Sequence, residues 1–177
     1  MDGLPMFEAL GPWPSVSGLP AETDARPALA GGDLHCLHAA EGWIELGDPV
    51  EANRELDGIS LEQRGHPDVM AVRWQIYAGA RMWRVCLIIA RILTERAPTD
   101  PRGWLALAET FFFMHRFQDA YTVAYTAALE FPESWLLLYA TARYAFRLGN
   151  TTEAEQYLQL AMAIGDRIAV MDKGRIA

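Results

Sequence analysis

The feature that most constrains the fold of this chain is an apolar pattern that returns every 34 residues. Blocks written from Asp33, Pro67, Pro101 and Trp135 carry small residues at two matched slots. The first slot holds Ala40, Ala108 and Ala142, and the second holds Ala52, Cys86, Ala120 and Ala154. Self-similarity at a period of this length indicates stacked units that bury their apolar faces against their neighbours. The small residues are expected where the two helices of one unit cross closely.

The predicted turns agree with this register. LGDPVEA (Leu46 to Ala52) and LGNTTEA (Leu148 to Ala154) share four letters. In each, a glycine ends one helix, Asp48 or Asn150 caps the next, and a glutamate follows three residues later. Prolines, which are tolerated at helix starts, mark the predicted boundaries between units at Pro67, Pro98, Pro101 and Pro132.

The third block resembles the tetratricopeptide repeat. The pattern is carried by Trp104, Leu107, Ala108, Phe111, Ala120, Ala124 and Pro132, with alanine in place of the usual glycine and phenylalanine in place of the tyrosine. Ala124 departs from the family because it stands where a large aromatic residue is usual. The resemblance implies an all-α fold, an α-solenoid of antiparallel helix pairs with about four units in a right-handed superhelix.

We expect the array to cover 33–168, with units starting near 33, 67, 101 and 135. Residues 1–32 are rich in proline and glycine and are expected to form a flexible tail, and 169–177 a C-terminal tail.

The segment from Arg81 to Leu93 has unusually little polar surface for the second helix of a unit. One stripe (Trp83, Cys86, Leu87, Ala90 and Leu93) is expected to face the first helix of its own unit. A second stripe, with Ile89 and Ile92, either packs between units or remains exposed as a docking patch. That patch would consist of Arg84, Ile88, Ile89, Arg91 and Ile92. Since 67–102 has six arginines against three acidic residues, the patch would suit an acidic partner, including an acidic copy of the chain in a homodimer.

By the resemblance, the first helices of the units line a concave face that binds an extended peptide. The residues in the lining slots are Leu37, Glu41, Ala71, Gln75, Leu105, Glu109, Phe112, Tyr139, Arg143 and Phe146. This set would suit a partly apolar peptide with a basic residue. Family members that grip the C-terminal carboxylate of heat-shock chaperones use lysine and asparagine in these slots, and this chain has neither there. Phe112 is equally well explained as packing between units.

Residues with metal-binding or catalytic chemistry are few. Asp33, His35, Cys36, His38 and Glu41 lie close in sequence, but Cys36 occupies a core slot and no second cluster supplies further ligands. We therefore expect no metal and no cofactor, and two buried, inert thiols. The chain has no phosphate loop, nucleophile elbow or zinc-protease motif, so we expect no catalytic residues and no enzymatic activity.

Charge and composition narrow the partner further. A net charge of -8 argues against a general nucleic-acid binder, which needs basic surface. No segment has the roughly 20 apolar residues that cross a membrane, and the first residues lack the basic start of a secretory signal. We expect a cytoplasmic protein that binds a protein or peptide.

Two functions fit these observations. The first is a small bacterial-style interaction module that binds a peptide or protein partner and catalyses nothing. The alternative is a cytoplasmic chaperone for a secreted substrate, because HAAEGWIELG loosely resembles the class II chaperones of type III secretion. Those chaperones dimerise through an N-terminal helix, whereas this N-terminus is interrupted by proline and glycine.

Overall fold

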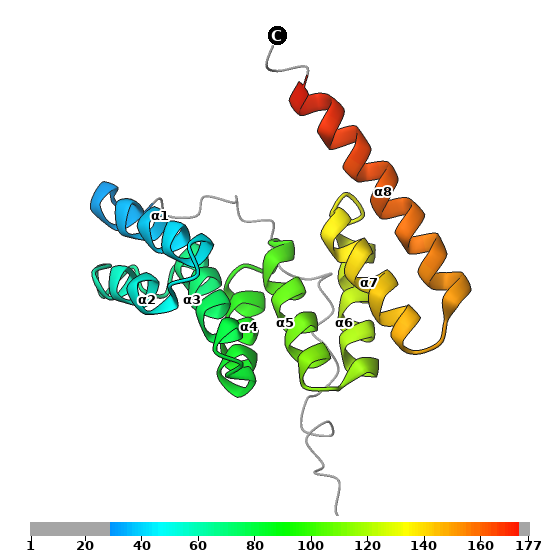
Figure 1. The fold of residues 1–177 in the computed structure, drawn as a ribbon, viewed down its shortest axis with the longest axis horizontal. Coiled ribbons are helices and arrows are strands. Elements are labelled where there is room, and N and C mark those ends of the chain that lie inside the picture. Colours follow the sequence, from blue (N-terminus) through cyan, green and yellow to red (C-terminus); the bar gives the residue numbers. More distant parts are fainter. Residues whose placement is uncertain (1–28, 174–177) are drawn as a thin grey trace, which may run out of the picture.

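The computed structural model of the chain describes residues 29–173, with side chains described as far as Arg167. The described residues form eight α-helices and no strand (Figure 1). The helices are α1 (Gly31–Glu45), α2 (Pro49–Asp57), α3 (Pro67–Gly79), α4 (Trp83–Arg96), α5 (Pro101–Phe113), α6 (Phe117–Glu130), α7 (Trp135–Arg147) and α8 (Thr151–Lys173). None of the described helices combines the length and the apolar character needed to cross a membrane. The predicted N-terminal tail lies almost entirely outside the described residues.

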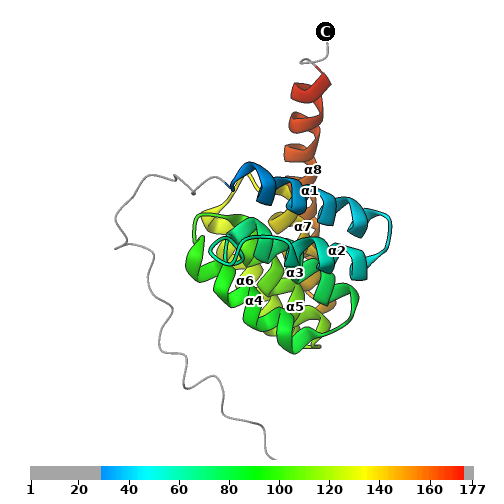
Figure 2. The same ribbon diagram turned by 90° about the vertical axis from the view of Figure 1, so that its left-hand side faces the viewer.

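The helices form four antiparallel pairs along the chain (Figure 1). The first helix of each pair begins at Gly31, Pro67, Pro101 or Trp135. The predicted cap of the second helix is confirmed at Asp48, whose carboxylate accepts hydrogen bonds from the backbone N–H groups of Val50 at 3.2 Å and Glu51 at 3.1 Å. The last helix continues to Lys173, beyond residue 168 where we expected the array to end, and extends past the other helices (Figure 2).

The pairs stack in two layers. The inner layer consists of α1, α3, α5 and α7, each of which contacts the next, and the outer layer consists of α2, α4, α6 and α8. The backbones of the outer helices lie farther apart, although side chains of α6 and α8 meet: the hydroxyl of Tyr121 donates to the carboxylate of Glu153, and the ring of Tyr125 contacts that of Tyr157. The array therefore curves with the inner layer on its concave side, as expected for an α-solenoid.

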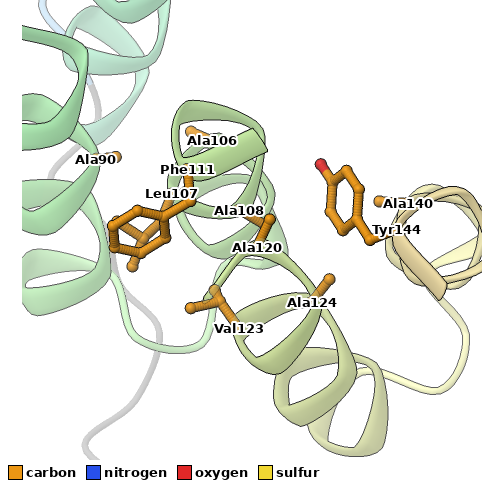
Figure 3. Close-up of a cluster of buried hydrophobic side chains, with 10 residues drawn as sticks. All are labelled: Ala90, Ala106, Leu107, Ala108, Phe111, Ala120, Val123, Ala124, Ala140 and Tyr144. Carbon is orange, nitrogen blue, oxygen red and sulfur yellow. The ribbon is translucent and has the colours of Figure 1, made fainter. Parts of the chain in front are cut away.

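The small slots lie in the core, because all seven residues predicted there are buried. Figure 3 shows the central cluster, to which α4 contributes Ala90, α5 contributes Phe111 and α7 contributes Tyr144. Trp74 stands at the slot where the other units have alanine. It is half-buried against this cluster, and its indole N–H donates to the hydroxyl of Thr110 in the next unit at 3.0 Å. The bulky residue thus links two units.

The second stripe of α4 is partly buried between units and partly exposed. Ile89 is only 6% exposed and Ile92 is half-buried, so both lie largely between units. Ile88, by contrast, is 61% exposed. The patch of the sequence hypothesis is therefore reduced to a narrow face of Arg84, Ile88 and Arg91, which are spaced four and three residues apart.

Candidate functional site

The inner layer presents most of the residues that the resemblance assigned to peptide binding. Glu41, Gln75, Tyr139 and Phe146 are exposed, whereas Leu105, Glu109, Phe112 and Arg143 are half-buried. We call these eight residues the inner face.

Leu37 does not belong to this face, although the sequence hypothesis included it. Its side chain is 4% exposed and packs with Leu56, Val69 and Val72 in the core of the first two units. Ala71 is half-buried and contributes little surface.

Two oppositely charged residues of the inner face form an ion pair with each other. Glu109 on α5 and Arg143 on α7 form an ion pair across the boundary between the third and fourth units. The guanidinium of Arg143 also lies over the rings of Phe112 at 4.8 Å and Tyr144 at 5.0 Å. Burial raises the pKa of Tyr144 above its ordinary value, so the phenol beside the guanidinium stays neutral. Because Arg143 already neutralises Glu109, this carboxylate is not available for a basic residue of a partner.

A series of aromatic contacts runs along one edge of the inner face. Trp83 at the start of α4 stacks on Phe113, with ring centroids 4.6 Å apart and planes 4° from parallel. Phe113 contacts Phe112 edge to face at 5.6 Å, and Phe112 contacts Phe117 at 5.4 Å. These four rings come from α4, α5 and α6 and form one continuous apolar wall.

This wall borders a hollow of about 670 Å³ at the C-terminal ends of α3, α5 and α7. We call it the end hollow. Besides the four rings it is lined by Ala78 and Gly79 and by three side chains that carry or can take a positive charge, Arg81, His115 and Arg147. None of its nine lining residues is acidic. The lining slots inferred from the sequence include only Phe112 of these nine residues, because the others lie at helix ends and in the turns between helices.

The cationic side chains are held by the turns and by the aromatic wall. The guanidinium of Arg147 lies 4.9 Å above the ring of Phe117, and His115 meets the same ring edge to face at 5.7 Å. Neither Arg81 nor Arg147 forms an ion pair with a described residue. Their charges are therefore available to a ligand.

Two of these residues have unusual backbone conformations. Arg81 and His115 have positive φ angles of 56° and 61° in the turns of the second and third units. The matching positions of the first and fourth units are Gly47 and Gly149, with φ of 80° and 88°. Every unit thus has a left-handed residue in this turn, and the second and third units use a basic residue in place of glycine.

The histidines and cysteine near the N-terminus form no comparable site. His35 and His38 are exposed on α1, and no group of three or more potential ligands lies close enough for a metal within the part of the chain that the structure describes. Cys86 is buried, and burial raises the pKa of its thiol. The expectation that Cys36 is also buried is wrong, because this thiol is only half-buried beside Gly58.

Comparisons with known proteins agree on the fold. No protein-family model matches the sequence, and no curated protein matches it. Among the solved structures that match is MamA MSR-1 C2, a tetratricopeptide-repeat protein, with a TM-score of 0.57. The two are 17% identical, and the match covers 75% of this chain and 76% of the other. At this identity the likeness shows a helical solenoid of the same type.

Proposed function

We propose that this protein is a non-catalytic interaction module that binds an extended segment of a protein partner along its inner face. The observation that carries the proposal is the exposure of large apolar side chains on the concave side of the array. Phe146 is 68% exposed and Tyr139 is 46% exposed, both on α7. Aromatic side chains that stay exposed on one concave face are typical of a recognition surface.

The two-layer packing supports this reading. Since the inner helices lie side by side, their exposed residues form one continuous strip across several units. The strip mixes apolar rings with polar groups such as Gln75 and Glu41, a combination that fits a peptide with alternating side chains. The residues of the inner face do not pair a nucleophile with a general base, so we propose binding without catalysis. We place the interaction in the cytoplasm, as expected from the sequence.

Peptide selection on the full-length protein tests the proposal. A random library of displayed peptides would be panned on the wild-type chain, and enriched peptides would be resynthesised for affinity measurements. We expect them to bind the variant Tyr139→Ala/Phe146→Ala at least tenfold more weakly, because burying one large apolar side chain contributes about 1.5–3 kcal/mol.

Leu129→Ala is the matched control. Leu129 is 61% exposed on α6 in the outer layer, so this variant removes a large apolar side chain from the other side of the array. Peptides should bind the control as they bind wild type. Failure to enrich any peptide, or equal binding to the double variant, would contradict the proposed function.

A further inference from the structure

We infer that the end hollow recognises an acidic side chain of the partner segment that lies next to an aromatic or other large apolar side chain. This inference rests on the proposed function, because the hollow adjoins the inner face and would receive one part of the same segment. It adds a chemical specificity that the exposed rings of α7 alone do not provide.

Charge favours an acidic group. Arg81, His115 and Arg147 belong to three different units, yet they line one hollow without an acidic neighbour among its lining residues. The first turn of α4 begins at the same edge, and it has neither an acidic residue nor a side-chain cap. Its free backbone N–H groups add to the positive potential there. A guanidinium group forms strong, charge-assisted hydrogen bonds with a carboxylate.

The aromatic wall favours an apolar neighbour for that carboxylate. The stacked pair of Trp83 and Phe113 continues through Phe112 to Phe117, so the hollow offers ring edges and faces over its length. Phe113 is 45% exposed although it belongs to this wall. A large apolar side chain placed there would remove both surfaces from water.

Compensation of helix dipoles does not explain the basic residues in the turns. Cations near the C-terminal ends of inner helices would be equally useful in every unit. The first and fourth units nevertheless have Gly47 and Gly149 at the matching position, where no side chain exists. Arg81 and His115 are therefore specific to the two turns that border the hollow.

The test uses the peptides selected on the wild-type protein. Each acidic residue in them would be replaced by its amide, and affinities would be measured by fluorescence anisotropy at physiological salt. We expect an acidic residue within two positions of an aromatic or large apolar one, and an approximately tenfold or greater loss when it becomes an amide. The variant Arg81→Gly/His115→Gly should bind the acidic peptide more weakly than wild type does and should distinguish it less well from the amide, because only Arg147 remains of the three basic side chains.

Arg84→Ala is the charge control, because it removes a positive charge from the same end of α4 without touching the hollow. It should preserve the discrimination. The glycine variant should melt no lower than wild type, since sibling units already have glycine at this position.

Peptides that need Tyr139 and Phe146 but bind equally well as amides would overturn the inference and leave the proposed function intact. Discrimination that is undiminished in the glycine variant would overturn it as well. A library that yields no binder would contradict the proposed function itself.

Discussion

Replacing Arg81 or His115 by glycine should stabilise the protein, although each replacement removes a whole side chain. A non-glycine residue in the left-handed region costs about 1–2 kcal/mol. Glycine removes this strain from the folded state. It also lowers the free energy of unfolding by about 0.5–1 kcal/mol, because it makes the unfolded chain more flexible. Arg81 is exposed and has no ion pair with a described residue, so Arg81→Gly should raise the free energy of unfolding by about 0.5–1 kcal/mol. His115→Gly should gain less, because it also loses the edge contact with Phe117.

The reverse substitution separates backbone strain from side-chain effects. Gly47 has a φ of 80°, beyond the roughly 50–70° that other residues tolerate, and a Cβ added there would meet no atom within 4 Å. Gly47→Arg should therefore lose about 1 kcal/mol through backbone conformation alone.

Urea unfolding followed by far-UV circular dichroism measures both changes. A difference of 1 kcal/mol corresponds to about 2–4 °C in Tm for a protein of this size. The denaturant slope should stay constant, which would show that the variants change stability without changing the surface exposed on unfolding. A lower midpoint for Arg81→Gly, or an unchanged midpoint for Gly47→Arg, would refute the reasoning.

Three further predictions follow from burial and hydrogen bonding. Ile89→Glu should cost about 3–5 kcal/mol because it buries an unpaired charge, whereas Ile88→Glu one residue earlier should change the unfolding free energy by less than about 0.5 kcal/mol and weaken any self-association seen by light scattering. The carboxylate of Asp33 accepts hydrogen bonds from the backbone N–H of Ser60 at 2.9 Å and from its hydroxyl at 2.7 Å, which lower the pKa of Asp33. The stabilisation is therefore present above the unfolded pKa of about 3.9 and is lost as the pH falls through the lowered folded pKa, so Ser60→Ala should destabilise at neutral pH and converge with wild type in acid denaturation. Ellman's reagent should titrate one thiol quickly in the native protein, that of Cys36, and the second only after unfolding; two fast thiols would contradict the burial described here.

Much of the fold follows from sequence because its determinants are local or periodic. The starts of α3, α5 and α7 coincide with the proline and tryptophan that open the predicted units, and the small slots are buried as expected. These features depend on spacing along one chain, which the sequence displays directly.

Part of the electrostatics of the site can be predicted from opposite charges that recur at the repeat spacing. Three ion pairs join residues 34 positions apart, each between equivalent slots of neighbouring units: Asp68 with Arg102, Glu109 with Arg143, and Glu133 with Arg167. A search for opposite charges at the repeat spacing would have found the pair of Glu109 and Arg143. It would also have shown that Glu109 is already paired and does not serve the basic peptide residue that the lining set was expected to suit.

The end hollow could not be derived in this way. It depends on the left-handed turn that points Arg81 and His115 toward rings from other helices, and on the depth to which those rings pack. Likewise, Leu37 stands at a slot that the resemblance assigns to the concave face, and Ile89 lies on a stripe that the sequence leaves either buried or exposed, yet both side chains are buried. Both depend on the angle between successive units, which results from the packing of many side chains together.

The wider spacing between the backbones of the outer helices has a mechanical consequence. Units are joined only to their immediate neighbours, so each boundary can bend or open by itself. The end hollow takes its walls from three successive units, and a molecule seated there would tie two boundaries together. Hydrogen exchange in α3, α5 and α7 would then slow together on binding, because the three units could no longer open independently of one another.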